Sequence, residues 1–110
     1  MEKIKILIVE DDKLLSTTYE MFVDQLGHES LGVCTTAEDA VTAFEQKHPD
    51  LIIMDIHLPG EMDGIDAAKK IIEKRKIPII YITSDHEKET ISRALAANSY
   101  GYLLKPLSIV

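Results

Sequence analysis

Acidic residues follow two apolar stretches of the sequence, in places where their carboxylates could act together. Residues 4–9 are followed by Glu10 and Asp11, and residues 51–54 are followed by Asp55. Two carboxylates about 4 Å apart repel each other by roughly 4 kcal/mol at an effective dielectric constant near 20. Three ionised carboxylates at one point therefore need a cation, and an oxygen-only ligand set with space for water suits Mg²⁺. The residue types thus predict a Mg²⁺ site made of these three acids.

Two further apolar stretches are followed by a hydroxyl group and by a lysine. Residues 77–82 precede Thr83, and residues 100–104 precede Lys105. Phosphoryl transfer depends mainly on positioning and on stabilisation of charge, which a lysine and a hydroxyl donor beside a cation would supply. Carboxylates accept phosphoryl groups when their own charge is neutralised. The pattern therefore predicts Asp55 as a phosphoryl acceptor with Lys105 and Thr83 beside it.

Alternating strands and helices are expected to position these side chains. The apolar stretches predict five strands at residues 4–9, 30–34, 51–54, 77–82 and 100–104. Residues with helical spacing between them predict four helices, the first ending at Gly27, the second between Thr36 and Pro49, the third over about 64–74 and the fourth over about 86–97. This order is typical of an α/β domain with a doubly wound, five-stranded parallel sheet. In such a sheet, ligands bind at the carboxyl ends of the strands.

Composition limits the class of protein. The chain has 110 residues, so we expect one domain over residues 1–110. Its net charge of −7 argues against a nucleic-acid surface, and no apolar run reaches the roughly 20 residues that span a bilayer. One cysteine and no signal peptide favour a cytoplasmic location. No helical segment follows the fifth strand, so we expect a domain truncated at its C-terminus, without an output domain in this chain.

Four motifs in chain order carry a resemblance to a known family: ILIVEDD, LIIMDIHLPGEMDGID, PIIYITS and GYLLKP. Over essentially the whole chain, they resemble the receiver domain of two-component response regulators, which has a flavodoxin-like fold. The resemblance implies that Asp55 is the phosphorylated aspartate and that Mg²⁺ is held by Glu10, Asp11, Asp55 and the backbone carbonyl of His57. It implies a switch hydroxyl at Thr83, a switch aromatic residue at Tyr102 and the active-site lysine at Lys105. Asp12 is the less certain acid of the first motif.

The function implied by this resemblance is phosphorelay signal transduction. A sensor histidine kinase or a phosphotransfer protein would donate a phosphoryl group to Asp55 with Mg²⁺ bound, and the domain would change conformation through Thr83, Tyr102 and Lys105. We expect such a domain to catalyse at most its own phosphorylation and dephosphorylation, and not to act as an enzyme on other substrates. A downstream protein, a fused output domain or a second copy of the chain would receive the signal, with no nucleic acid or membrane bound directly.

Three alternatives belong to other classes. A pseudo-receiver would keep the fold and signal without phosphorylation, although the acid, threonine and lysine set argues against it. A Mg²⁺-dependent phosphatase would carry a second catalytic acid two residues after the nucleophile, where His57 stands. A flavodoxin or nucleotide-binding protein would carry a glycine-rich loop after the first strand, where the sequence reads EDDKLL.

Overall fold

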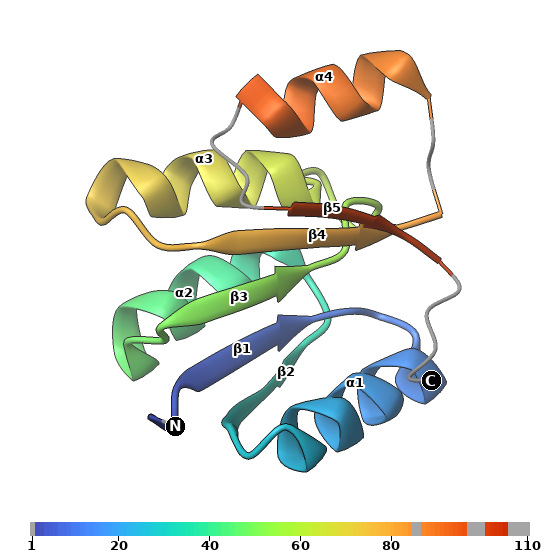
Figure 1. Ribbon diagram of the computed structural model, residues 1–110. Helices are drawn as coiled ribbons and strands as arrows, with labels where there is room; N and C mark the ends of the chain where they lie inside the picture. The colour runs from blue at the N-terminus through green and yellow to red at the C-terminus, as the bar shows by residue number, and fades with distance from the viewer. Residues whose placement is uncertain (1, 85–86, 97–100, 106–110) are drawn as a thin grey trace.

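Strands and helices alternate along the whole described chain (Figure 1). The structure is a computed structural model and describes residues 2–84, 87–96 and 101–105. The strands are β1 (Lys5–Val9), β2 (Glu29–Cys34), β3 (Leu51–Met54), β4 (Ile79–Thr83) and β5 (Gly101–Leu104). The helices are α1 (Lys13–Gln25), α2 (Ala37–Lys47), α3 (Gly64–Lys74) and α4 (Lys88–Ala96).

The strands form one parallel sheet in the order β2-β1-β3-β4-β5. β2 lies on one side of β1, and β3, β4 and β5 follow one another on the other side. The direction in which strands are added to the sheet therefore reverses at β1. This arrangement confirms the predicted α/β, flavodoxin-like fold with a parallel sheet. The expectation that no helix follows β5 concerns residues 106–110, which lie outside the described residues and leave that prediction untested.

The helices cover both faces of the sheet (Figure 1). On one face, Tyr19 and Val23 of α1 pack with Ile6, Ile8 and Ile82 of the strands. The larger cluster on the other face joins alternate strand residues to α2, α3 and α4, and its members include Leu7, Val9, Phe44, Ile52, Met54, Ile65, Ile71, Tyr81 and Ala94. Successive residues of one strand thus enter different clusters, as the two-residue period of a strand requires.

The ends of the helices follow local signals in the sequence. The Thr36 side chain accepts a hydrogen bond from the Asp39 amide at 3.1 Å and caps the start of α2. Gly27 adopts φ of +83° after α1, a left-handed conformation that glycine tolerates. β4 begins at Ile79, two residues later than predicted, directly after Pro78, which has no backbone N–H to donate.

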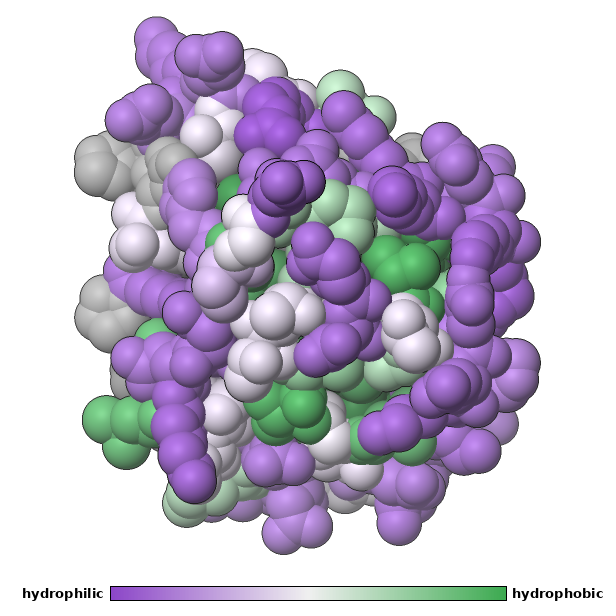
Figure 2. Space-filling model, turned by 180° about the vertical axis from the view of Figure 1, so that it is seen from behind, coloured by the Kyte–Doolittle hydropathy of each residue, from purple (hydrophilic) through white to green (hydrophobic). Residues whose placement is uncertain are grey.

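The surface opposite to the view of Figure 1 is largely hydrophilic, with small separate hydrophobic patches (Figure 2). Leu14, Met21 and Leu26 are the large apolar residues most exposed among those described. Within the described ranges, no helix is both long enough and apolar enough to span a membrane.

Candidate functional site

Backbone hydrogen bonds fix the positions of three predicted site residues at the carboxyl edge of the sheet. The amide of Glu10 donates to the Cys34 carbonyl at 2.9 Å, and the amide of Asp55 donates to the Val9 carbonyl at 2.9 Å. The amide of Lys105 donates to the Thr83 carbonyl, also at 2.9 Å. Each residue thus continues the strand ladder by one position beyond its strand. The sheet therefore holds the backbone of all three residues in a defined register.

The predicted acids come together at this edge. Glu10, Asp11 and Asp55 each offer a carboxylate oxygen, and these oxygens lie within 4.8 Å of one another. Glu10 is 1% exposed and Asp55 is 5% exposed, whereas Asp11 is exposed to solvent. Mg²⁺ prefers oxygen ligands and usually retains several waters, so a cluster of carboxylates with one member open to solvent fits this cation.

Lys105 supplies the positive charge that the acids require. Its Nζ lies 2.8 Å from Oε1 of Glu10 and 3.1 Å from Oδ2 of Asp55. Burial alone would lower the pKa of Lys105, but its contacts with the two carboxylates outweigh burial and hold this pKa above its ordinary value. Lys105 is therefore a protonated bridge between the strand ends of β1 and β3.

The carboxyl group of Glu10 has a raised pKa. Burial raises the pKa of Glu10 to about 7; Lys105 opposes this shift, and the neighbouring Asp55 adds to it. One buried lysine thus compensates only part of the negative charge at the site. A second cation beside the carboxylates would relieve this imbalance, which is a further reason to regard the cluster as a cation site.

Asp12, the less certain acid of the first motif, belongs to the helix. Its side chain accepts a hydrogen bond from the Leu15 amide at 3.0 Å and forms the N-cap of α1. Its own amide donates to Oε2 of Glu10 at 3.1 Å, so the start of α1 also holds the Glu10 carboxylate. The Asp12 carboxylate is not a member of the acid cluster found among the described residues.

The loop after Asp55 is tied to α3 by contacts that the sequence patterns did not reveal. The Gly64 amide donates to the Ile56 carbonyl at 2.7 Å, and a Cβ at Gly64 would lie 2.0 Å from the backbone oxygen of Asp55. Only a glycine allows α3 to approach the candidate acceptor so closely. The motif contains this glycine, but which backbone it approaches depends on the tertiary structure.

A second set of contacts joins α3 to α4. Asp63 and Asp66 form a capping box at the start of α3, with hydrogen bonds of 2.9 and 3.1 Å. Arg93 of α4 reaches the same two carboxylates, at 3.1 Å from Asp63 and 3.5 Å from Asp66. These two ion pairs join residues 30 and 27 positions apart, so no local pattern in the sequence could indicate them.

For the remaining predicted site residues, the described part of the chain shows fewer contacts with the acid cluster. Thr83 is buried at the end of β4, and its carbonyl anchors Lys105. His57 lies two positions after Asp55, with an exposed side chain. Tyr102 belongs to β5, and its side chain lies outside the described part of the chain. The structure therefore brings together Glu10, Asp11, Asp55 and Lys105, with Thr83 at the same edge of the sheet.

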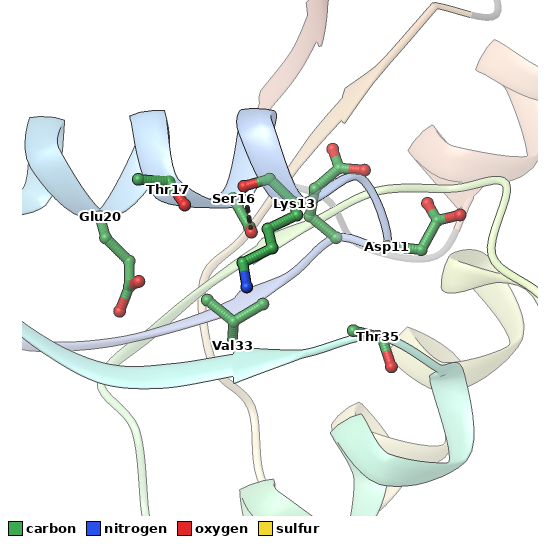
Figure 3. A pocket seen from close by; sticks show the side chains of 8 residues that line it. Asp11, Lys13, Ser16, Thr17, Glu20, Val33 and Thr35 are labelled. Atoms are coloured by element: carbon green, nitrogen blue, oxygen red, sulfur yellow. Dashed lines mark hydrogen bonds between the residues drawn. The ribbon is translucent and has the colours of Figure 1, made fainter.

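A groove between α1 and β2 opens beside the acids (Figure 3). Its volume is about 440 Å³, and Lys13 extends from the start of α1 toward Val33 across it. Glu10 and Asp11 form its end nearest to the site, and the other lining residues are Lys13, Ser16, Thr17, Glu20, Val33 and Thr35. The acid cluster is therefore accessible from solvent on this side.

Comparisons with known proteins agree with this geometry. The family model of the response regulator receiver domain matches residues 6–110. The chain is 37% identical over 105 residues to the transcriptional regulatory protein PdtaR of Mycobacterium tuberculosis, covering 96% of this chain and 51% of that protein. It is 39% identical over 85 residues to the phyllosphere-induced regulator PhyR of Methylorubrum extorquens, covering 76% of this chain and 32% of that protein. The chain thus spans between about a third and a half of the length of these relatives.

Solved structures show the same fold. The signal receiver domain of a modulated diguanylate cyclase from Desulfovibrio desulfuricans G20 matches with a TM-score of 0.90 and 37% identity, covering 97% of this chain and 85% of that one. A response regulator receiver domain protein from Methanospirillum hungatei JF-1 matches with a TM-score of 0.90 and 26% identity, over the same shares of the two chains. The family model and these relatives show that the chain belongs to the response regulator receiver domains of two-component systems.

Proposed function

We propose that this receiver domain accepts a phosphoryl group on Asp55 in a Mg²⁺-dependent reaction. The observation that carries the proposal is the buried Asp55 carboxylate 3.1 Å from the Lys105 ammonium, within 4.8 Å of the oxygens of Glu10 and Asp11. An acceptor carboxylate needs neutralising charge on both sides, and these residues provide one cation and the ligands for another.

The donor would be a phosphohistidine on a sensor histidine kinase or a phosphotransfer protein. An oxygen of Asp55 attacks phosphorus, the bond between phosphorus and the imidazole nitrogen breaks, and the electron pair leaves with the imidazole. Lys105 stabilises charge on the transferred group, and Glu10 and Asp11, with Asp55 and the His57 carbonyl, would hold Mg²⁺. Mg²⁺ held there would supply positive charge beside the phosphoryl oxygens.

Phosphorylation would bias the domain between two conformations. It adds about −1.5 to −2 charges and three acceptor oxygens at Asp55, which attract Lys105 and the Thr83 hydroxyl. Movement of Thr83 would make space for Tyr102. A complete shift from 1:99 to 99:1 needs roughly 5.5 kcal/mol of differential stabilisation. We infer that the two contacts supply part of this energy and that a partner selecting the active form supplies the rest.

The domain would act as a switch rather than as an enzyme on other substrates. Because the chain spans only part of its relatives, we propose that a downstream protein, a second copy of the chain or an output domain of a longer polypeptide reads the switch. PdtaR is described as a transcriptional regulatory protein, which is compatible with a fused output domain. A cytoplasmic location, typical of receiver domains, is part of the same proposal.

Intact mass after incubation with acetyl phosphate tests this function. One added phosphoryl group is expected with Mg²⁺ and none after chelation or in Asp55→Asn. Asp50→Asn is the matched control, because Asp50 caps the opposite end of β3 by accepting a hydrogen bond from the Lys5 amide at 2.8 Å. Labelling of Asp55→Asn, or loss of labelling in Asp50→Asn alone, would contradict the proposal. An unlabelled protein that also fails to bind Mg²⁺ would favour the pseudo-receiver.

A further inference from the structure

Tyr19 in α1 carries a buried hydroxyl group that the packing of the domain does not explain. The residue is 3% exposed, and its hydroxyl has no hydrogen-bond partner among the described residues. An unpaired polar group in a protein interior is unfavourable, and few native groups remain in that state. A phenylalanine, such as the nearby Phe22 of the same helix, would fill an apolar site without this cost.

Tyr19 packs on the face of the sheet from which the site residues emerge. It shares a cluster with Ile8 of β1 and Ile82 of β4. Two positions beyond Ile8, on the same face, is Glu10, and Asp55 continues the face on which Ile53 lies. Tyr19 therefore packs on the same face of the sheet as the side chains of Glu10 and Asp55.

Lys105 reaches the same face from the other side of the site. The register of β4 with β5 pairs Ile82 with Leu103, so position 105 continues the face that Tyr19 covers. Lys105 contacts Glu10 and Asp55, as its ion pairs show. An ammonium group has three N–H donors, and these two ion pairs leave one donor for a further acceptor.

The electrostatics agree with this placement. Burial raises the pKa of the Tyr19 hydroxyl, while the charge of Lys105 acts on it in the opposite direction and those of Glu10 and Asp55 act in the same direction. Charges of the site, together with that of the neighbouring Asp12, therefore act on this hydroxyl. A neutral phenol keeps both lone pairs, so it can accept a hydrogen bond from an ammonium group.

We propose that Tyr19 is a positioning residue for Lys105, whose ammonium donates a hydrogen bond to the Tyr19 hydroxyl when Asp55 is phosphorylated. In the unphosphorylated domain, Lys105 is held by Glu10 and Asp55. The added phosphoryl group draws Lys105 away from Glu10, and the Tyr19 hydroxyl gives the displaced ammonium a second fixed contact. The Tyr19 hydroxyl, which has no partner among the described residues of the unphosphorylated domain, is thus a hydrogen-bond acceptor for Lys105 in the phosphorylated domain. This inference rests on the proposed function.

Tyr19→Phe tests the proposal with beryllofluoride and Mg²⁺ as a mimic of the phosphoryl group. The variant loses only the hydroxyl, so the midpoint of thermal unfolding without ligands should stay the same or rise. The dissociation constant of beryllofluoride should increase about tenfold, as expected for a lost hydrogen bond to a charged group. The dissociation constant of Mg²⁺ alone should change less than twofold. A general structural defect would instead weaken both.

Tyr81→Phe is the matched control. Tyr81 is a fully buried tyrosine in β4 that belongs to the cluster on the opposite face of the sheet. Its replacement should leave the affinity for beryllofluoride unchanged. Equal affinities of Tyr19→Phe and the unsubstituted protein would overturn the inference, and so would an equal loss of affinity for Mg²⁺ and beryllofluoride. No binding of beryllofluoride to the unsubstituted protein would remove the proposed function itself, and this inference with it.

A spectroscopic measurement does not depend on the folding of the variant. In protein labelled with ¹³C at tyrosine Cζ, the Tyr19 resonance should shift when Mg²⁺ and beryllofluoride saturate the site, because its hydroxyl gains a charged donor. The Tyr81 resonance serves as the internal reference. A Tyr19 resonance that shifts no more than that of Tyr81 would contradict the proposal.

Discussion

Lys105 separates two buried carboxylates that would otherwise repel each other. Its ammonium lies 2.8 Å from Glu10 and 3.1 Å from Asp55, while the exposed Asp11 completes the acid cluster. Two carboxylates and one lysine leave the buried centre with excess negative charge. Burial is the main cause of the raised pKa of Glu10, and the neighbouring Asp55 adds to it. The site is thus arranged to gain stability from a second cation.

The pH dependence of stability should reveal the raised pKa of Glu10. The folded protein holds the Glu10 proton with a pKa of about 7, against an ordinary value of 4.5. A raised carboxyl pKa stabilises the folded state fully below pH 4.5, and this contribution is lost as the pH rises through 7. Without Mg²⁺, the free energy of unfolding should therefore fall between about pH 4.5 and pH 7. Urea unfolding at several pH values measures this change.

Glu10→Gln is the control for this prediction, because an amide does not titrate. The fall in stability across the same pH range should become smaller in this variant. Saturating Mg²⁺ should also reduce it, because a cation bound to the ionised carboxylate competes with the proton. A pH profile identical in Glu10→Gln and the unsubstituted protein would show that another group titrates.

At the residue scale, the sequence predicted the positions of the site but not all of its contacts. Acids at the ends of apolar strands indicated Glu10, Asp11 and Asp55, because parallel strands bring their carboxyl ends to one edge. The role of Asp12 as a helix cap follows from the start of α1. The contact between Lys105 and Glu10 could not be predicted, because it depends on how far each side chain extends past the ends of β3 and β4, which lie between β1 and β5.

Helix α3 and the loop before it form one structural unit with the candidate acceptor. Gly64 brings the helix start against the backbone of Asp55, and Asp63 caps the same turn. Arg93 connects this turn to α4. The sequence predicted the bounds of α3 from its apolar spacing, but not this connection, because it joins residues far apart in the chain.

Gly64→Ala should displace this unit. Its Cβ would meet the Asp55 carbonyl oxygen at 2.0 Å, so the backbone of α3 or of the acceptor must move. We expect a loss of about 2–3 kcal/mol in the free energy of unfolding and slower phosphorylation by acetyl phosphate. Urea unfolding and intact mass measure the two effects.

Gly27→Ala is the matched control for this substitution. Gly27 has φ of +83°, and a Cβ there would meet nothing within 4 Å. The substitution should lower the free energy of unfolding by about 1 kcal/mol through backbone strain alone, and it should leave the rate of phosphorylation unchanged. A normal phosphorylation rate in folded Gly64→Ala would contradict the role assigned to the close approach.

Arg93→Ala should loosen α4. The ion pairs with Asp63 and Asp66 are partly exposed, so their loss should lower the free energy of unfolding by only about 0.5–1 kcal/mol. Amide hydrogen exchange in α4 should become roughly two- to fivefold faster, since α4 loses a contact with α3. Lys88→Ala, at the exposed start of the same helix, is the control. Equal exchange rates in both variants would show that the ion pairs do not restrain α4.

At the scale of the whole molecule, different parts of the sheet serve stability and chemistry. Its two faces carry the hydrophobic clusters that stabilise the fold, and its carboxyl edge carries the charges. The apolar strands and the helical periods predicted this architecture, because burial on both faces requires nearly continuous apolar strands. The strand order was not predicted, since spatial neighbours such as β1 and β3 are not neighbours in the chain.

Mg²⁺ should stabilise the whole domain. A ligand that binds only the folded state at about one hundred times its dissociation constant adds about 2.7 kcal/mol to the free energy of unfolding. Thermal unfolding with and without Mg²⁺ measures this gain. Asp11→Asn should reduce it strongly, whereas Asp50→Asn, at the far end of β3, should retain it. An equal gain in both variants would place the cation elsewhere.

Localising the phosphoryl group on the chain shows whether Asp55 is the acceptor. After reaction with acetyl phosphate and Mg²⁺, borohydride reduction converts a phosphorylated aspartate to homoserine, and peptide mapping then identifies its position. Homoserine is expected at position 55 alone, and nowhere when Mg²⁺ is chelated. Homoserine at another acid, with Asp55 unmodified, would contradict the assignment of Asp55 as the phosphoryl acceptor.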